Sequence, residues 1–509
     1  MIPISPRALG LALPISLFSS VAFADLTPAQ VWGDWRSYLE GMGYQITATE
    51  AESGGSLTVS DINLSFALPE DGDMSMGLGT IRFDQNRDGT VAIVMPDTMP
   101  ITMQGRDSGP GAEETTMTMI YTQTGHALTA SGDPNEMTYL YTADAVALNL
   151  DSLQVGDEVI GRDRARIAVN ASNIDATTTM TIGDARGYTQ SGSIDGANYD
   201  IFFIDPENPA MQAAITGNVS GVTMNGTGTI PRDLPNAADM SQMLAAGFDV
   251  TGSFAYTGGA SNFDIKDPEN GDYVMATTSS GGQLSVDMGS DGLAYAGSQQ
   301  NVNMGVTVAG MPFPFEIAMA QSGFNLAMPV SASEEPQDFA LGLNFGDFTM
   351  SDMIWSTFDP AGQLPRDPAT VILDLAGKAK LLVDWMNPEA AAQMSGPPGA
   401  LEELTLNNLV VDAAGARLEG AGAVTFDGTG PSMMPGMANP VGEVNMSLAG
   451  GNALLDKLVA MGLLPQDQAM GARMMMGLFA VPGDAPDTLK SNIQFTQDGQ
   501  ILANGQRIR

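Results

Sequence analysis

The sequence contains no cysteine and only one histidine, so two of the side chains that most often carry recognisable chemistry are almost missing. Without cysteine the chain forms no disulfide, and a chain of this length can bury a large core without one. A single histidine is too few for a histidine-based zinc site. These absences favour a binding or structural protein over an enzyme.

Positive charge is also scarce, with 20 Lys and Arg against 59 Asp and Glu, which gives a formal net charge of −39. Binding to nucleic acid requires clustered cations that release counterions from the phosphates, and docking on anionic membranes requires basic patches. We therefore expect neither partner. The acids are spread through turn-like segments, which is typical of a well-solvated surface.

Long hydrophobic runs are absent, since no segment of the mature chain approaches 18 consecutive apolar residues, and we expect no transmembrane span there. The amino end contains Arg7, an apolar stretch and then Ala22-Phe-Ala24, the pattern of a signal peptide with a small-x-small cleavage site. Residues 1–24 are predicted to be removed between Ala24 and Asp25, giving a periplasmic protein. The alternative is an uncleaved anchor.

Short runs with alternating apolar and polar residues fill most of the chain. Strict alternation predicts strands with one buried and one solvated face, as in antiparallel sheets. A one-residue phase slip near Ser60-Asp61 predicts a β-bulge, and the Gly-rich residues 216–228 are expected to turn a tight corner. The alternating apolar residues include Leu57, Val59, Ile62, Leu64, Phe66, Leu68, Met117, Met119, Tyr121, Met137, Tyr139, Tyr141, Val146, Leu148, Leu150, Phe248, Val250, Phe254, Tyr256, Leu284, Val286, Met288, Val302, Met304, Val306 and Val308.

Helical patterns are few. Thr27 as N-cap, Pro28 in the first turn and Gln30 at the third position predict a capped helix that ends near Gly41. Its apolar side predicts a lid on the sheet edge, with a partner site as the alternative. Further helices are predicted over residues 237–247, 378–394, 453–461 and 466–479.

The predicted fold class is mainly β with a few helices (α+β), a large curved or folded antiparallel sheet built from hairpins, with helices capping its edges. The clearest hairpin turns at Asp498-Gly499 and should close a sheet edge. Two Pro-containing stretches, residues 329–336 and 430–440, are predicted loops. They suggest a β-rich region over residues 25–335 and a second one, with three helices, over residues 336–509; the two together are also compatible with one continuous domain.

Two acidic motifs resemble metal-binding loops. Residues 84–89 match the first half of a calcium loop, D-x-N-x-D-G, but the twelfth position holds Met95 instead of a bidentate glutamate. A turn between two strands is therefore the preferred interpretation, and calcium is the alternative. Residues 267–272 are also interpreted as a turn.

The sequence gives little support for a catalytic histidine, a copper site or a dinucleotide-binding motif. His126 has no G-x-S-x-G nucleophile elbow to serve, so it is interpreted as a loop residue. Met474, Met475 and Met476 raise the possibility of copper, but consecutive helical residues point about 100° apart and do not converge. Neither Gly77-Leu-Gly79 nor Gly226-Thr-Gly228 has the third glycine of a dinucleotide-binding motif. We assign no catalytic, cofactor-binding or metal-binding residue, and no cofactor.

The carboxyl-terminal half resembles a known family. The residues that carry the likeness are Phe339-Ala-Leu-Gly-Leu-Asn-Phe345, Asp352-Met-Ile-Trp355, Phe358-Asp-Pro360, Leu364-Pro-Arg-Asp-Pro-Ala-Thr370 and Leu373-Asp-Leu375. They are similar to domain-of-unknown-function family 2125 (DUF2125), uncharacterised exported proteins of alphaproteobacteria; the Trp32-Gly-Asp-Trp35 segment also fits. The resemblance implies a periplasmic location and no catalytic motif.

A second likeness is to large periplasmic β-sheet proteins of the AsmA type. It rests on residues 404–409, 420–426 and 450–455 and on the final Asp498-Gly499 and Asn504-Gly505 turns. This likeness implies a role near the cell envelope, such as lipid handling.

The expected function follows from the few helices, which are too few to cover the apolar face of so many strands. We expect a non-enzymatic periplasmic binding or scaffold protein of the cell envelope that holds lipid in a groove, with a lipid or an envelope protein as partner. The alternatives are a carboxylate-based hydrolase acting on carbohydrate, which needs neither Cys nor His, and a module that pairs through exposed strand edges.

Overall fold

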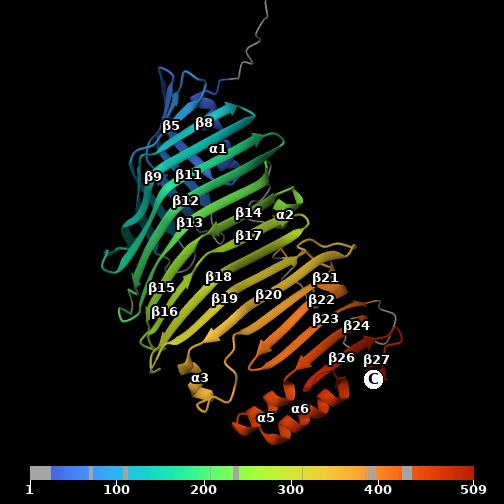
Figure 1. Cartoon of the computed structure of the whole chain (residues 1–509). Helices are drawn as coiled ribbons and strands as arrows, with labels where there is room; N and C mark the ends of the chain where they lie inside the picture. The colour runs from blue at the N-terminus through green and yellow to red at the C-terminus, as the bar shows by residue number, and fades with distance from the viewer. Residues whose placement is uncertain are drawn as a thin grey trace, which may run out of the picture.

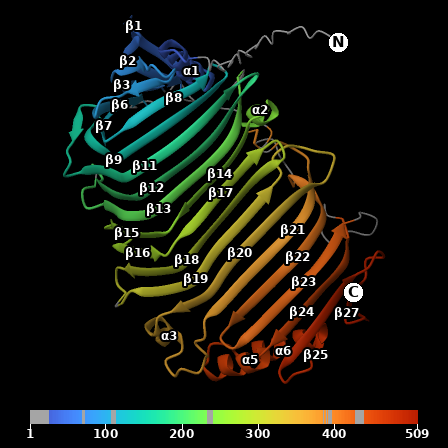
Figure 2. The same cartoon turned by 45° about the horizontal axis from the view of Figure 1, so that its top comes forward.

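The computed structural model describes residues 25–508, except 68–72, 107–112, 207, 233–239, 312, 385, 388–389, 391–396 and 427–437. Within these residues 28 strands join in one sheet, and neighbouring strands run antiparallel. The predicted architecture, mainly β with few helices, is confirmed. Figures 1 and 2 show a sheet that twists from end to end and long middle strands that bend along their length.

The first part of the chain forms one helix and a set of short hairpins that end in a long strand. α1 begins after the Thr27 cap, where the Thr27 hydroxyl accepts from the Gln30 amide and the Gln30 side chain accepts from the Thr27 amide, as predicted. The elements are α1 (Pro28–Gly41), β1 (Gln45–Ser53), β2 (Ser56–Ala67), β3 (Asp73–Leu78), β4 (Ile81–Gln85), β5 (Val91–Val94), β6 (Thr98–Arg106), β7 (Glu114–Thr124), β8 (Ala127–Asp133) and β9 (Glu136–Val155).

The middle of the chain builds the widest part of the sheet from strands of up to 20 residues. Two short helices interrupt it. The elements are β10 (Glu158–Ile160), β11 (Ala165–Ile182), β12 (Ala185–Ile204), β13 (Gln212–Pro231), α2 (Met240–Ala245), β14 (Asp249–Tyr256), β15 (Gly258–Lys266), β16 (Tyr273–Ser279), β17 (Gly282–Gly289), β18 (Gly292–Val308), β19 (Phe315–Met328), β20 (Gln337–Met350) and α3 (Asp352–Phe358).

The last part of the chain continues the same sheet and adds a pair of helices. In both Figure 1 and Figure 2 these helices lie at the end of the sheet opposite α1. The elements are β21 (Ala369–Leu381), β22 (Gly399–Ala413), β23 (Ala416–Phe426), β24 (Pro440–Ala449), α5 (Gly451–Ala460), α6 (Gln466–Phe479), β25 (Val481–Pro482), β26 (Thr488–Phe495), β27 (Ile501–Ala503) and β28 (Gln506–Arg507).

The two faces of the sheet differ sharply in polarity. Directly paired residues of antiparallel strands point to the same side, so a line of paired residues samples one face. One such line, from β11 to β19, is entirely apolar: Ile167, Ile201, Ile215, Phe263, Met275, Val306 and Phe315. A line on the opposite side of the same strands is Asn170, Asn198, Asn218, Ala260, Thr278, Asn303 and Ala318. We call the two sides the apolar face and the polar face.

A series of bulges crosses the long strands at similar heights. At each one a residue with a positive φ is left out of the pairing, namely Asp61, Asn173, Gly221, Asn301 and Asp347. The register itself shifts at Asp61, against β1, and at Asp347, against β21. Asp, Asn and Gly tolerate this left-handed conformation, and bulges bend a strand and increase its twist. The residues that follow three of these positions, Ile62, Val222 and Val302, are buried. The predicted bulge at Ser60-Asp61 is therefore confirmed and is one of a series.

Several local predictions are confirmed. Helices form at residues 240–245, 451–460 and 466–479, and residues 329–336 form a loop. The hairpin around Asp498-Gly499 pairs β26 with β27 near the last edge of the sheet. Residues 1–24, Leu68 and most of the predicted 430–440 loop lie outside the described residues.

Two predictions are wrong. Residues 216–228 make no tight corner, because they belong to the 20-residue strand β13; Gly221 supplies only a bulge, where the neighbour of β13 changes from β15 to β14. The helix predicted over residues 378–394 is wrong at its start, because residues 378–381 end strand β21, where pairing with β20 and β22 outweighs helix propensity. Helix α3 was not predicted.

The proposed division near residue 335 falls inside the sheet. Strand β19 precedes it and β20 follows it, and the two pair directly over several residues. The sheet is thus continuous across residues 329–336, while the division into two regions stays a prediction.

Candidate functional site

The apolar face carries a set of large side chains that are open to solvent. Every exposed large hydrophobic residue within the described parts of β11 to β21 lies on this face, with 36–47% of its surface exposed. They are Val169, Phe203, Leu284, Tyr295, Phe324, Leu341, Phe345 and Val371. Contiguous exposure of this kind marks a binding surface more often than scattered single residues do.

Six of these residues gather on strands β17 to β21, and we call this group the open apolar patch: Leu284, Tyr295, Phe324, Leu341, Phe345 and Val371. Pairing connects them, since Gly297 lies between Leu284 and Phe324, Leu326 lies between Tyr295 and Leu341, and Phe345 pairs with Val371. No charged residue takes part in these lines. The backbone groups are already used in the sheet, so the patch offers a ligand apolar contact alone.

Aromatic rings lie across glycines on this face. A β-carbon added to Gly297 would stand 2.6 Å from the Phe324 ring, so the ring occupies the space over the glycine of the neighbouring strand. The same arrangement recurs on this face where an aromatic residue pairs with a glycine: Tyr188 with Gly228, Tyr199 with Gly217, Tyr256 with Gly282 and Phe339 with Gly377. Covering a glycine in this way stabilises the strand and holds the ring against the sheet.

One end of the apolar face is closed by α1. The same line of paired residues that contains Tyr295 begins, across the intervening strands, at Tyr139. Tyr139 is only 9% exposed because Trp35 of α1 packs on it, with ring centroids 6.2 Å apart. Trp32 and Trp35 also contact the fully buried Phe83. Here the sheet and helix form a closed hydrophobic core.

A buried polar group fastens α1 in place. The Asp34 carboxylate of α1 lies 2.6 Å from the Arg186 guanidinium of β12, and both side chains are about 5% exposed or less. The Tyr139 hydroxyl donates to Asp34 at 3.1 Å, and the Arg186 side chain lies over the Tyr38 ring. Burial, and then the negative charge of Asp34, raise the pKa of Tyr139, so this hydroxyl stays a donor. These residues line a pocket of about 360 Å³ beside the helix.

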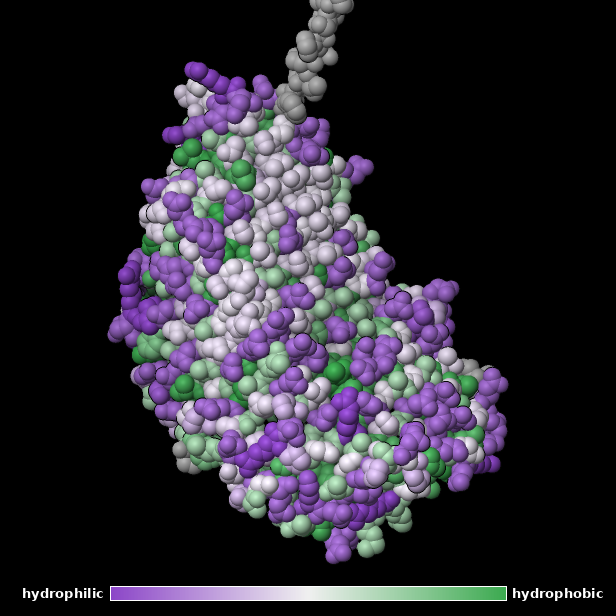
Figure 3. Space-filling model, in the orientation of Figure 1, coloured by the Kyte–Doolittle hydropathy of each residue, from purple (hydrophilic) through white to green (hydrophobic). Residues whose placement is uncertain are grey.

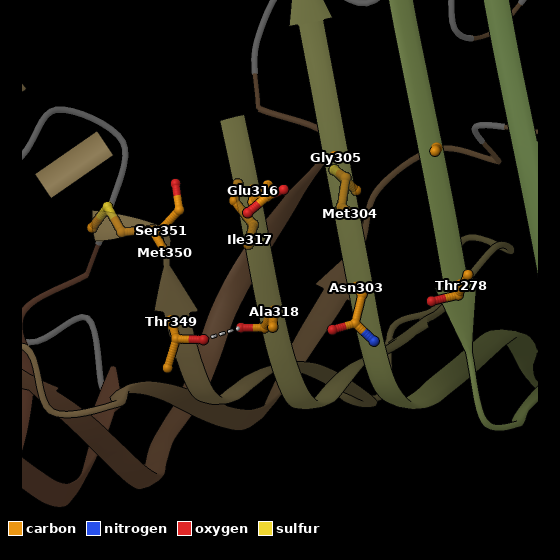
Figure 4. Close-up of a pocket in the computed structure, with 11 residues that line it drawn as sticks. Thr278, Asn303, Met304, Gly305, Glu316, Ile317, Ala318, Thr349, Met350 and Ser351 are labelled. Carbon is orange, nitrogen blue, oxygen red and sulfur yellow. Dashed lines mark hydrogen bonds between the residues drawn. The ribbon is translucent and has the colours of Figure 1, made fainter. Parts of the chain in front are cut away.

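The polar face carries a different depression. Figure 3 shows one side of the molecule, on which purple and pale side chains prevail over the middle strands. A pocket of about 520 Å³ is lined by Thr278, Asn303, Ala318 and Thr349, where Thr349 donates to the Ala318 carbonyl (Figure 4). Glu316 is the one carboxylate in its lining. A glycosidase requires a pair, so this pocket does not supply the carboxylate site of the alternative function.

The motifs considered in the sequence are placed as follows. Residues 84–89 end β4 and form the turn toward β5, where the Asp88 carboxylate accepts from the Thr90 amide and hydroxyl, so the turn interpretation is confirmed. Residues 267–272 form the β15–β16 turn, with Asp267 accepting from the Glu269 and Asn270 amides. His126 lies between β7 and β8, with Nε2 3.2 Å from the Met95 carbonyl. Among the described residues no three His, Cys, Asp or Glu side chains form a metal cluster.

The three consecutive methionines diverge, as expected of a helix. Met474 is 73% exposed, whereas Met475, at 53% exposure, and Met476 line a cavity between α6 and the sheet. Thus the geometry does not bring these three thioethers to one point.

The alternation in the sequence located part of the open apolar patch and missed the rest. Leu284 was recognised as an inward residue of a strand, and its paired neighbour Phe254 as well. Phe345 was noticed only as part of the family resemblance, although Phe339, Leu341, Leu343 and Phe345 alternate. Nothing local to the sequence indicates which apolar residues stay uncovered.

Within the described residues the fold defines a class of protein, an extended antiparallel sheet with one apolar face. Helix α1 covers this face at one end, α6 covers it in part at the other, and large apolar side chains are exposed between them. Residues 259–507 match the family described as uncharacterized proteins conserved in bacteria, DUF2125. This region of the chain therefore belongs to the DUF2125 family, and the assignment made from its sequence is confirmed. The match includes all six residues of the open apolar patch. No curated protein matches the chain. The likeness to AsmA-type proteins stays a prediction.

Proposed function

We propose that this chain is a periplasmic, non-enzymatic binding protein of the cell envelope whose open apolar patch holds the acyl chains of a lipid. The observation that carries the proposal is the confinement of the large exposed hydrophobic residues of the middle strands to one face of the sheet. Apolar area that stays in contact with water is unfavourable by about 25 cal/mol per Å² relative to burial. A hydrocarbon ligand removes this cost.

The chemistry of the patch favours hydrocarbon over a peptide. A peptide added to a sheet binds through free backbone groups at an edge, whereas the patch lies on a face whose backbone groups are paired. The apolar line from Ile167 to Phe315 crosses seven strands, which at roughly 4.8 Å per strand is about 29 Å, longer than an extended acyl chain.

The compartment is part of the proposal. The amino-terminal pattern with Ala22-Phe-Ala24 supports export, and the AsmA-type likeness supports a place in the envelope. No helix among the described residues is long and apolar enough to span a bilayer. The mature amino terminus, read by mass spectrometry from a periplasmic fraction, should begin at Asp25; an intact Met1 would contradict this part.

No specific observation favours the hydrolase alternative. That function requires a carboxyl whose pKa is raised so that it acts as an acid. The carboxyl groups of the described residues with a resolved shift, Asp84, Asp88, Asp267, Asp359, Asp484, Asp487 and Asp498, have lowered pKa values.

The test is native mass spectrometry and lipid extraction of the mature chain, followed by titration of the delipidated protein with a fluorescent fatty acid. The double variant Leu284→Asp/Phe324→Asp should lose affinity by about tenfold or more, because charge in the patch is desolvated by the ligand. Asn325→Asp is the matched control, since it adds a carboxylate to the same strand on the polar face. Protein that carries no lipid and binds no probe would refute the proposal, as would equal losses in the two variants.

A further inference from the structure

The outer side of α6 is apolar and exposed. Met470, Met474 and Leu478 are 64%, 73% and 55% exposed, and their spacing of four residues places them in one stripe along the helix. Ala469, on the opposite side of the helix, is 1% exposed and faces the protein. Met475, Leu463 and Val481, with 44–53% exposure, extend the stripe on its flanks. Six large apolar side chains are thus exposed in α6 and directly next to its two ends.

The inner side of α6 is apolar too. A cavity of about 360 Å³ separates the helix from the sheet, lined by Leu418, Met446, Leu448, Met476, Phe479, Leu489 and Ile493 among others. A helix that is apolar on both sides is typical of a helix covered on both sides. The sheet covers the inner side of α6 incompletely, and within the described residues the outer side is bare.

The cavity under α6 is connected to the open apolar patch by strand pairing. Phe345 and Val371 of the patch begin a line of directly paired residues that reaches the cavity through Val411. The line then continues through three residues that line the cavity, Leu418, Leu448 and Leu489. Every member is aliphatic or aromatic. An apolar track therefore leads from the patch to the space beneath α6.

The charge around α6 differs from that of the rest of the chain. Residues 451–490 carry four carboxylates and three cations, a net charge of −1, in a chain with a net charge of −39. Arg473, the cation of α6, is engaged with Asp456 at 2.6 Å and with Asn452. Few charges therefore lose their hydration when this end of the molecule meets a surface without net charge.

We infer that the stripe Met470, Met474 and Leu478 docks this end of the protein on a zwitterionic phospholipid bilayer, so that acyl chains pass beneath α6 into the apolar track. This inference rests on the proposed function. The bilayer is preferred to a protein partner because Met475, beside the stripe, also lines the cavity beneath α6, and this cavity continues into the apolar track. Methionine side chains are flexible and adapt to the irregular packing of lipid tails.

The experiment is co-flotation of the mature chain with phosphatidylcholine vesicles. The triple variant Met470→Gln/Met474→Gln/Leu478→Gln should lower vesicle binding roughly tenfold or more, because three side chains leave the acyl boundary. The matched control is Val159→Gln/Met311→Gln/Leu382→Gln, which replaces three residues of 48–66% exposure outside the helices and should bind as the natural chain does. Thermal unfolding of both variants reports whether each one is folded.

The outcomes separate this inference from the proposed function. Loss of vesicle binding in the triple variant, with its affinity for the fluorescent fatty acid retained, supports the inference. A natural chain that holds lipid but does not float with vesicles overturns the docking and leaves the proposed function standing. Vesicle binding by a chain that binds no fatty acid overturns the proposed function and the passage beneath α6. A dimer that the same three substitutions dissociate, without vesicle binding, shows that a second copy covers the stripe and overturns the inference.

Discussion

Tyr139 and Tyr295 occupy the same line of paired residues on the apolar face, yet their environments are opposite. Tyr139 is 9% exposed, packs on Trp35 and donates to Asp34, whereas Tyr295 is 39% exposed. The sheet is the same at both positions, and the difference is the helix that covers one of them. An amphipathic sheet therefore supplies both a core and a binding surface, according to where a helix lies.

Removal of the covered tyrosine should have the largest effect on stability. Tyr139→Ala leaves a cavity beneath α1 and is expected to lower the free energy of unfolding by about 3–5 kcal/mol. Tyr295→Ala removes a ring that already faces solvent and should cost less than about 1 kcal/mol. Urea denaturation of both variants measures the comparison; equal effects would mean that the face around Tyr295 is covered too.

Breaking the buried ion pair between Asp34 and Arg186 should have the next largest effect on stability. Arg186→Met keeps apolar volume but leaves Asp34 buried without its cation. This should destabilise by about 3 kcal/mol, the lower part of the range for broken buried pairs, because the Tyr139 hydroxyl still donates to Asp34. The control is Arg166→Met in β11, whose partner Asp200 is 41% exposed, with an expected effect within about 1 kcal/mol. Proteolysis at α1 should increase in the first variant only.

A smaller effect is expected when a ring is lifted into the open apolar patch. Gly297→Val would displace Phe324, which has open space above it, so the cost should be near the low end for overpacking, about 1 kcal/mol. Binding of the fluorescent fatty acid should weaken clearly. In the same strand a β-carbon added to Gly305 has no atom within 4 Å, so Gly305→Val should leave binding unchanged. Unchanged binding in the first variant would show that this part of the face takes no ligand.

The smallest expected effect is the loss of local stability at the start of α5 in acid. Burial alone would raise the pKa of Asp487, but hydrogen bonds from the Ala453 amide and from Asn452 hold it below the usual 3.8. A carboxyl with a lowered folded-state pKa stabilises above its unfolded pKa, and this stabilisation is lost as the pH falls through the lowered value. The first amides of α5 should therefore exchange faster in acid. The free energy of local opening should fall by less than about 1 kcal/mol, because the Asp487 carboxylate is largely solvated.

The control for this prediction is Asp487→Asn, which retains the positive φ of the position and removes the charge. Its α5 amides should exchange faster at neutral pH and lose most of their dependence on acid. A variant with an undiminished acid response would assign the effect to another carboxyl.

Local sequence patterns predicted most of the fold and little of the site. The capping box at Thr27, the Asp498-Gly499 hairpin and the bulge at Asp61 were correct because turn and cap preferences act over a few residues. The errors at residues 216–228 and 378–381 share a cause: Gly and Lys-Ala patterns argue against strands locally, but pairing on both sides holds them extended.

The sequence alone determined the antiparallel sheet with one apolar and one polar face, since side-chain alternation with period two is a local property. It also determined helices at the two ends of the chain. Only the tertiary structure decided which stretch of the apolar face is covered, because coverage depends on contacts between distant residues such as Asp34 and Arg186, which lie 152 positions apart. The same alternation thus encodes a closed core under α1 and an open apolar patch on β17 to β21.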